Sequence, residues 1–471
     1  MKIRKLPELV EGSFYTAIPI GLLFILSISY STAFLKTGFW ADDFMQLGTF
    51  YHNIGSFTDT SVTLGRFWAN IYWGFSTTAF GSASDTPYII FSSAIFFLSL
   101  YFWVKAFGSF LTPAKISWIL VFLFASATPF QLMLWASNSV HTIALLIVSI
   151  GFFAISKQLR NVSVYTPISS LSMLESTTYI LFLFANPLYS PYLVIGLVSA
   201  VCKIWNLHKH KSQPFRLLNQ SYFAVFQVVI PMWILFGFSI PKTLKNSAYQ
   251  HASPKNIGKN LTFYQGMLAG SHLQQGMFIG FLITAIFFAI RSLATKNWIS
   301  FAAFFFGFST LLIVLCQQNQ HVLNYLVAPL LGILTGFAIE LASFRLFSPN
   351  KLNRVIATIV CSFLFICVFS GSYSIRQWWI DYNPGYAVQN VREHIHQLVP
   401  NNANICFEEN LSPAQKSWFE GGLDGKWGLL HAPVNAENVL FMPIHGCNLA
   451  EGFTILRVDP DTRNSFVVTN I

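Results

Sequence analysis

The chain is organised around the stretch Leu35-Lys36-Thr37-Gly38-Phe39-Trp40-Ala41-Asp42-Asp43-Phe44, which follows directly on the first apolar segment. Two adjacent acids are unusual in a sequence of which only 10% is charged. The stretch opens a polar region, residues 36–87, between the first two long apolar segments. This region therefore predicts a functional loop just outside the first membrane crossing.

A helix is predicted in the second half of that loop. Its apolar positions recur at helical spacing and are Leu64, Phe67, Trp68, Ile71, Tyr72 and Phe75. The other face carries Arg66, Asn70 and Thr77, which would lie without partners in hydrocarbon if the helix crossed a bilayer. The pattern thus favours a helix lying flat at the membrane interface.

Composition sets the class of the protein. Of 471 residues, 54% are hydrophobic and 10% charged, whereas soluble domains carry about 25% charged residues. We therefore expect an all-α polytopic membrane protein with about eleven transmembrane helices. The expected spans lie near residues 14–34, 88–108, 116–134, 137–156, 164–184, 188–206, 219–240, 276–294, 298–316, 322–344 and 353–374.

Charge divides the chain into two parts. Residues 1–374 carry a net charge of +14 and residues 375–471 one of −4. The first part is the predicted transmembrane domain, and the second a small extracytoplasmic domain of α/β or mainly β structure. Cys406 and Cys447 both fall in this tail and could pair if it faces an oxidising compartment. No nucleic-acid motif accompanies the basic charge.

The positive-inside rule orients the spans. A basic N-terminus and the basic cluster 203–216 fall on the cytoplasmic side, which leaves the tail outside. The loop 241–275 is an exception, because it is basic and expected outside. It is either kept for binding an anion or simply solvated. Its cationic residues are Lys242, Lys245, His251, Lys255 and Lys259.

The chain resembles the GT-C superfamily of membrane glycosyltransferases in four features. They are the acid pair in the first outer loop, the Gly65-Arg66 pair on an interfacial helix, the many further spans and the outer tail. The specific match covers residues 13–90, and within the superfamily the chain is most similar to bacterial O-antigen (serotype-converting) glucosyltransferases. The resemblance implies a GT-C-like fold in the bacterial inner membrane, with a cytoplasmic N-terminus and a periplasmic C-terminal domain.

The resemblance also implies an activity. Such an enzyme moves a sugar, with glucose expected, from a polyprenyl-phosphate donor to O-antigen, lipopolysaccharide or another envelope glycan. Asp42 or Asp43 is then the base for the acceptor hydroxyl. The same pair suits Mg²⁺ or Mn²⁺ as a metal site, and either acid could instead only cap a helix starting at Phe44.

Cations and polar groups on the outer side supply the remaining candidates. Positive charge near the departing phosphate is expected from Arg66, Lys242, Lys245 and Arg376. Two outer segments offer aromatic and amide groups for a sugar. They contribute Trp135, Asn138 and His141, and Gln317, Gln318, Asn319 and His321. The alternatives are an aromatic belt for the first segment and a polar hairpin for the second.

Two other protein classes stay open. An O-antigen polymerase or ligase would use arginines and histidines of later outer loops. A lipid-linked glycan transporter or flippase would place paired charges inside spans. Glu175 and Glu340 are the acids within the expected spans; Glu175 should face protein, and Glu340 lies near an inner end. This scarcity of intramembrane charge counts against ion-coupled transport.

Overall fold

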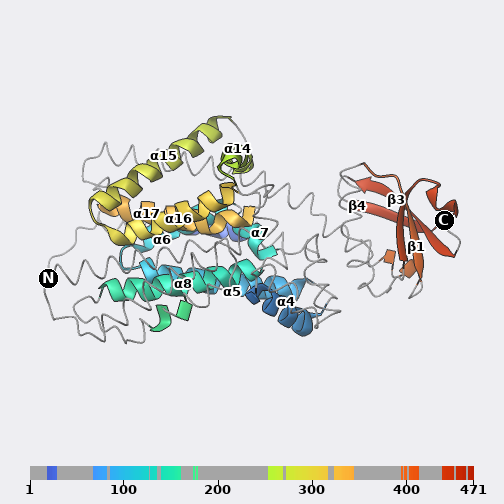
Figure 1. Cartoon of the computed structure of the whole chain (residues 1–471), viewed down its shortest axis with the longest axis horizontal. Coiled ribbons are helices and arrows are strands. Elements are labelled where there is room, and N and C mark those ends of the chain that lie inside the picture. The colour runs from blue at the N-terminus through green and yellow to red at the C-terminus, as the bar shows by residue number, and fades with distance from the viewer. Residues whose placement is uncertain are drawn as a thin grey trace.

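The computed structural model consists of a helical bundle and a four-stranded sheet near the C-terminus (Figure 1). It describes residues 19–28, 67–81, 85–126, 128–134, 139–160, 173–175, 177–178, 253–268, 272–316, 323–343, 394–395, 397–399, 403–412, 438–449, 452–462 and 465–470. The longer helices are α4 (Phe67–Phe80), α5 (Thr86–Phe107), α6 (Pro113–Ala125), α7 (Thr128–Leu134), α8 (Ser139–Arg160), α14 (Ile257–Leu268), α15 (His272–Ala294), α16 (Trp298–Cys316) and α17 (Val327–Ser343). Short 3₁₀ turns precede α14 and α17, namely η7 (Pro254–Asn256) and η8 (Leu323–Leu326).

Three of the described helices are long and apolar enough to cross a membrane: Thr86–Phe107, Val140–Lys157 and Trp298–Cys316. They match the spans expected near 88–108, 137–156 and 298–316. Shorter apolar helices cover Pro19–Ile28, Lys115–Ala125, Ile279–Ala294 and Val327–Glu340. The protein is therefore mainly helical with several candidate spans.

The total of eleven spans stays a prediction. The spans expected at 188–206, 219–240 and 353–374 lie outside the described residues. The span expected at 116–134 is wrong as a single helix, because α6 ends at Ala125 and α7 starts at Thr128. Pro129 explains this break, since its ring nitrogen has no hydrogen to donate back to the preceding turn.

Polar side chains fill the break between α6 and α7. The Ser126 hydroxyl donates to the Leu123 carbonyl at 2.6 Å and lies 2.8 Å from the Thr128 hydroxyl. Both side chains are buried. At the break, the helical backbone hydrogen bonds are interrupted, and these side-chain hydroxyls provide hydrogen-bond partners there. Such partners make a break tolerable inside an apolar bundle.

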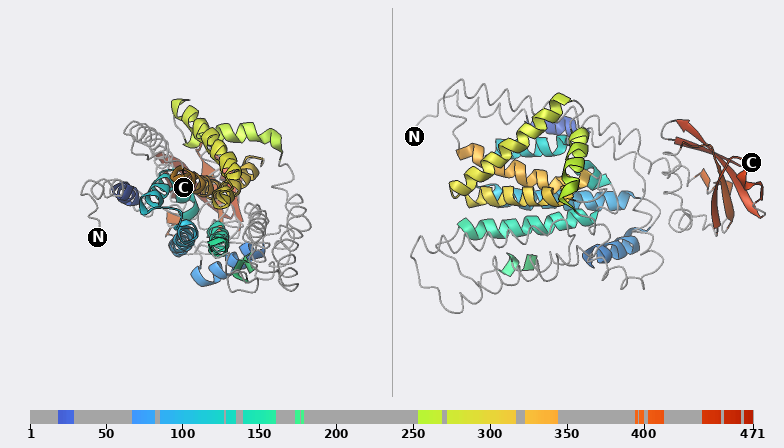
Figure 2. Two further views of the ribbon diagram at one scale, coloured as in Figure 1. Left: turned by 90° about the vertical axis from the view of Figure 1, so that its left-hand side faces the viewer. Right: turned by 45° about the horizontal axis from the view of Figure 1, so that its top comes forward.

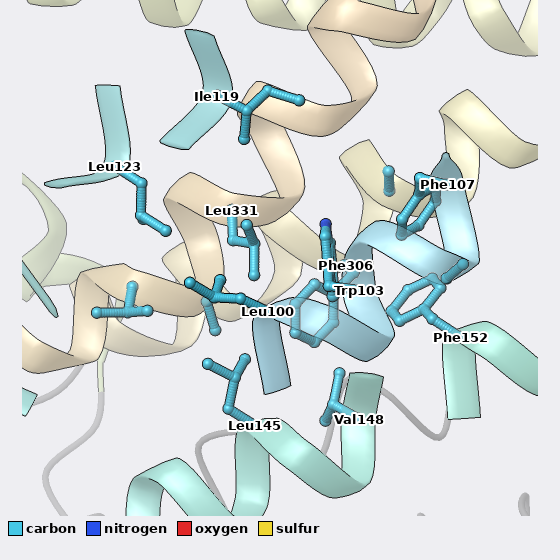
Figure 3. Close-up of a cluster of buried hydrophobic side chains, with 14 of the residues drawn as sticks. Leu100, Trp103, Phe107, Ile119, Leu123, Leu145, Val148, Phe152, Phe306 and Leu331 are labelled. Carbon is cyan, nitrogen blue, oxygen red and sulfur yellow. The ribbon is translucent and has the colours of Figure 1, made fainter. Parts of the chain in front are cut away.

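An aromatic cluster joins α5, α8 and α16 at the centre of the bundle (Figure 3). The ring of Trp103 lies 5.0 Å from those of Phe107 and Phe152 and 5.8 Å from that of Phe306. Its indole nitrogen donates to the Thr335 hydroxyl on α17 at 2.9 Å. One tryptophan thus ties four helices together, and each aromatic pair contributes about 0.5–1.5 kcal/mol beyond burial.

Glycines allow α16 and α17 to approach closely. A Cβ added at Gly307 would lie 2.7 Å from the Ile333 backbone nitrogen, and one at Gly332 would lie 2.8 Å from the Ala303 carbonyl oxygen. Small residues at such a crossing let two backbones touch, which is how helices associate where water provides no driving force.

Interhelical contacts fix the helix directions. His141 in the first turn of α8 contacts Tyr325 just before α17, and Ser92 near the start of α5 donates to Leu132 at the end of α7. At the opposite end, Asn297 before α16 donates to Glu340 late in α17. Helices α5, α8 and α17 therefore run in one direction and α16 in the other.

Basic side chains gather at one end of this bundle, which we call the basic end. They lie late in α5 and α8, early in α6, and in the turn from α15 to α16: Lys105, Lys115, Lys157, Arg291 and Lys296. The other end carries α7, η8 and α14, and we call it the polar-loop end. In Figures 1 and 2 the C-terminal sheet lies beyond the polar-loop end.

The two acids expected within spans are both fully buried. For Glu175 this agrees with the prediction that it faces protein. Glu340 accepts a hydrogen bond from Asn297 at 2.7 Å and pairs with Arg291. Both partners lie at the basic end, as expected for an acid near an inner helix end.

The sheet has the strand order β2-β1-β3-β4. Its strands are β1 (Asn404–Glu409), β2 (Asn438–Pro443), β3 (Phe453–Thr462) and β4 (Ser465–Asn470). The first three are parallel, and β4 is antiparallel to β3. Helical residues at 394–395 and 397–398 precede β1. The tail is thus a small α/β unit, the first of the two classes expected for it.

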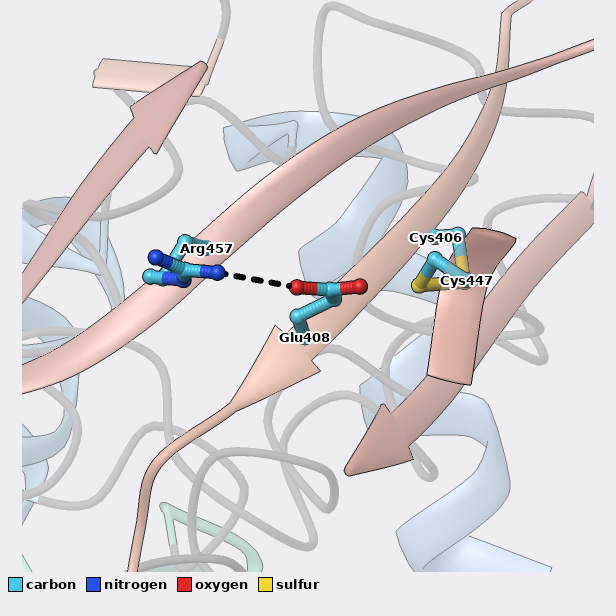
Figure 4. Close-up of a disulfide and its surroundings, with 4 residues drawn as sticks. All are labelled: Cys406, Glu408, Cys447 and Arg457. Atoms are coloured by element: carbon cyan, nitrogen blue, oxygen red, sulfur yellow. Dashed lines mark hydrogen bonds and ion pairs between the residues drawn. A yellow bond between two sulfur atoms is a disulfide. The ribbon is translucent and has the colours of Figure 1, made fainter. Parts of the chain in front are cut away.

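A disulfide fastens the crossover between β2 and β3 to the central strand (Figure 4). The chain must return across β1 within residues 444–452, which include the short 3₁₀ helix η9 (Gly446–Leu449). Cys447 in η9 bonds to Cys406 in β1, with the two Cα atoms 6.0 Å apart. The pairing expected for an oxidising compartment is therefore present.

Candidate functional site

Of the predicted site residues, only His141 lies within the described part of the chain. The remaining predicted residues are outside it: Asp42, Asp43, Arg66, Trp135, Asn138, Lys242, Lys245, Gln317, Gln318, Asn319, His321 and Arg376. The candidate site must therefore be built from the described residues next to these positions in the chain.

His141 is buried in the first turn of α8, with 7% of its surface exposed. Its ring meets the Tyr325 ring edge-on, with the centroids 5.1 Å apart and an interplanar angle of 78°. This packing holds the start of α8 against η8. In this structure His141 thus joins α8 to η8, a role that its polar surroundings in the sequence did not indicate.

The two segments predicted to bind sugar start and end beside each other. Residues 135–138 connect α7 to α8, and residues 317–322 connect α16 to η8. Helix α7 packs against η8, and His141 packs against Tyr325. The four ends of these connections therefore meet at the polar-loop end.

The segment Ser253–Leu268 is fastened to the same place. The backbone nitrogen of Ser253 donates to the Cys316 carbonyl at 2.8 Å, and the Asn256 side chain donates to that carbonyl at 3.1 Å. Asn260, which is only 1% exposed, donates to the Leu315 carbonyl at 2.8 Å. These bonds satisfy the last carbonyls of α16, which the helix itself leaves without donors.

These anchors place Ser253, the first residue after the basic segment 241–252, beside Cys316 at the end of α16. Residues 241–252, which include Lys242 and Lys245, lead directly into Ser253. Ser253 is held to Cys316, and residues 317–322 begin immediately after Cys316. The described residues that border three segments selected from the sequence for sugar or phosphate binding thus lie together at the polar-loop end.

Helix α4 confirms a helix in the second half of the first loop, and it begins directly after Arg66. Its last turn is fixed to α5 by the Tyr88 hydroxyl, which donates to the Gly81 carbonyl at 2.7 Å. Thr77, predicted on a polar face, is buried, whereas Phe75, predicted on the apolar face, is 60% exposed. The polar side of this part of the helix therefore faces protein and Phe75 faces outward.

Asparagines 256 and 260 were not among the predicted site residues. A local signal for their helix was present, since Ser253 followed by Pro254 is a typical N-cap and first helical residue. Ser253 indeed accepts from the Lys255 amide at 3.3 Å. The bonds to α16 span more than fifty positions and have no such local signal.

Among the residues that the structure describes, no three His, Cys, Asp or Glu side chains gather as ligands for an ion. The carboxylates predicted to suit Mg²⁺ or Mn²⁺ are outside those ranges.

Comparison with known proteins identifies no relative: no family model matches the chain, and no curated protein sequence matches it. Any functional conclusion must therefore rest on the chain's own residues and their arrangement.

Proposed function

We propose that the chain is an integral membrane glycosyltransferase that transfers a sugar, such as glucose, from a polyprenyl phosphate to an envelope glycan. The observation that carries this proposal is that the described residues bordering three predicted ligand-binding segments lie together at the polar-loop end. A lipid-linked donor and a glycan acceptor must be held at the same membrane surface, and these bordering residues lie at one end of the bundle.

The proposed chemistry needs a base and a cation. Asp42 or Asp43 removes the proton from the acceptor hydroxyl while the hydroxyl oxygen attacks the anomeric carbon of the donor sugar. The bond from that carbon to the donor phosphate breaks. Arg66, Lys242, Lys245 and Arg376 are the candidates for stabilising the charge on the departing phosphate. A divalent ion at the acid pair would supply further positive charge there.

Two observations support an orientation in the bacterial inner membrane. Five cations of the described bundle gather at the basic end, against two, Lys255 and Lys259, at the polar-loop end, and this excess suits the cytoplasmic side. The Cys406–Cys447 disulfide suits an oxidising compartment such as the periplasm for the tail. Both support the proposal that the polar-loop end, and with it the reaction, lies on the outer side.

Transfer from radiolabelled polyprenyl-phosphate glucose tests the proposal in membranes containing the full chain. We expect Asp42→Asn or Asp43→Asn to lower the transfer rate by about 100-fold or more, as loss of a general base does. Asp461→Asn in the tail is the matched control and should leave the rate unchanged.

The glycan product distinguishes the proposed transferase from the main alternative, an O-antigen polymerase. A side-branch transferase leaves the length of the polysaccharide chain unchanged when the acids are replaced. Shortened chains with the branch sugar intact would instead identify a polymerase. Absence of transfer by the unaltered protein from any polyprenyl-phosphate sugar would refute the proposal.

A further inference from the structure

Helix α14 crosses the end of the bundle instead of running along it. In both views of Figure 2, as in Figure 1, its axis lies across the common direction of α16 and α17. If those helices span a bilayer, a helix placed in this way lies in the plane of the membrane surface.

The segment made of η7 and α14 has two unlike faces. Asn260 and Tyr264 point inward and are each 1% exposed. The opposite face is exposed and consists of Lys255, Gly258, Lys259 and Thr262, which follow one another at helical spacing. We call these four residues the lysine face.

The charge of the lysine face is not balanced nearby. No acid occurs in the sequence from Ser253 to Leu268. Within the ranges that the structure describes, no carboxylate forms an ion pair with Lys255 or Lys259. Hydrogen bonds to α16 keep these two lysines at the polar-loop end, away from the cluster of cations at the basic end.

The helix that follows α14 presents an apolar surface. Along α15, six large apolar side chains are between 39% and 64% exposed: Ile279, Ile283, Ile286, Phe287, Ile290 and Leu293. Surfaces of this kind face lipid in membrane proteins. Helix α14 packs against α15 at the polar-loop end, and a helix lying there in the plane of the membrane surface is at the level of lipid head groups.

We propose that the lysine face binds the phosphate groups of anionic phospholipids in the leaflet at the polar-loop end. The lysine stems reach along the helix while their ammonium groups meet phosphate, and the hydrogen bonds of Asn256 and Asn260 keep the face at a fixed height. This binding anchors the candidate site to the membrane surface. It does not depend on the proposed transferase activity.

A photo-crosslinking amino acid in place of Thr262 tests the proposal directly. The Thr262 hydroxyl bonds only to the Gly258 carbonyl of its own helix, so its replacement leaves the anchors to α16 in place. The full chain is placed in nanodiscs with equal amounts of phosphatidylglycerol and phosphatidylcholine, and lipid adducts are identified by mass spectrometry. We expect phosphatidylglycerol adducts to exceed phosphatidylcholine adducts by about fivefold.

Two further variants make the result specific. Lys255→Gln with Lys259→Gln should bring the two adducts to equal yield, while the melting temperature stays that of the parent. The same crosslinker at Ile286, on the apolar surface of α15, should give lipid adducts without preference for either head group.

Three results would overturn the proposal. One is the absence of any lipid adduct at position 262, and another is equal yield with both lysines intact. The third is displacement of phosphatidylglycerol by a tenth as much polyprenyl phosphate, which would assign the face to that lipid instead.

Discussion

Arg291 and Glu340 are 49 positions apart in the chain and form an ion pair that joins α15 to α17. The Glu340 side chain is fully buried, whereas that of Arg291 is 24% exposed. Asn297, just before α16, donates to the other carboxylate oxygen of Glu340 at 2.7 Å. One carboxylate therefore holds together three helices at the basic end.

Removing either charge should destabilise the bundle. Arg291→Met removes the cation that pairs with the buried Glu340, and we expect a loss of about 3–5 kcal/mol in the free energy of unfolding. Arg291→Met combined with Glu340→Leu removes both charges and should recover much of that loss. Unfolding in mixed micelles measures both variants, and a single variant as stable as the parent would contradict the role of the pair.

The α16–α17 contact should not tolerate a methyl group. Gly307→Ala would place its Cβ 2.7 Å from the Ile333 backbone nitrogen, and backbone shifts of this kind cost about 1–3 kcal/mol. Gly280→Ala in α15 is the matched control, because nothing lies within 4 Å of its Cβ. Thermal melting should fall for the first variant and stay level or rise for the second.

The Cys406–Cys447 disulfide should dominate the stability of the tail. It closes a loop with a sequence separation of 41, which corresponds to about 4 kcal/mol of unfolded-chain entropy. Cys406→Ser with Cys447→Ser should therefore increase hydrogen exchange across residues 438–449 without changing exchange in α16. Equal exchange in the two proteins would show that the sheet does not need the bond.

Glu408 should make the tail sensitive to acid. Burial alone raises the pKa of its carboxyl, but hydrogen bonds from the His445 and Cys447 amides and from Arg457 outweigh burial and lower that pKa below its ordinary value. The Arg457 contact measures 3.3 Å (Figure 4). Because the folded state binds the proton less well than the unfolded state, the stabilisation is present above the ordinary pKa. It is lost as the pH falls through the lowered one.

Melting of the tail followed between pH 7 and pH 3 measures this effect. Below the ordinary carboxyl pKa, the melting temperature of the parent tail should fall as the pH is lowered. The melting temperature of Glu408→Gln should change less over the same pH range. A parent profile as flat as that of the variant would contradict the assignment to Glu408.

Sequence patterns located the features that depend on local composition. The span expected at 298–316 has the bounds of α16, and the strands expected in the tail are present. The break between α6 and α7 was missed because apolar character continues across it, although Pro129 marks the position. Mean apolar content identifies a span and does not reveal an interruption within it.

Contacts between segments that lie far apart in the chain could not be predicted from sequence patterns. The edge-on packing of His141 and Tyr325 joins residues that no local period relates. The inward position of Thr77 depends on neighbouring helices, because amphipathic spacing separates two faces without saying which one meets protein. The predicted catalytic acids stay predictions, since they lie outside the described residues.

Asn260 has a consequence for the choice of expression host. Asn260-Leu261-Thr262 is an acceptor triplet for N-linked glycans, and the amide that would carry the glycan is the one bonded to Leu315. A eukaryotic secretory pathway that modified this side chain before folding would prevent α14 from docking. Production in such cells should therefore use Asn260→Asp or Thr262→Ala, of which the second preserves the buried amide.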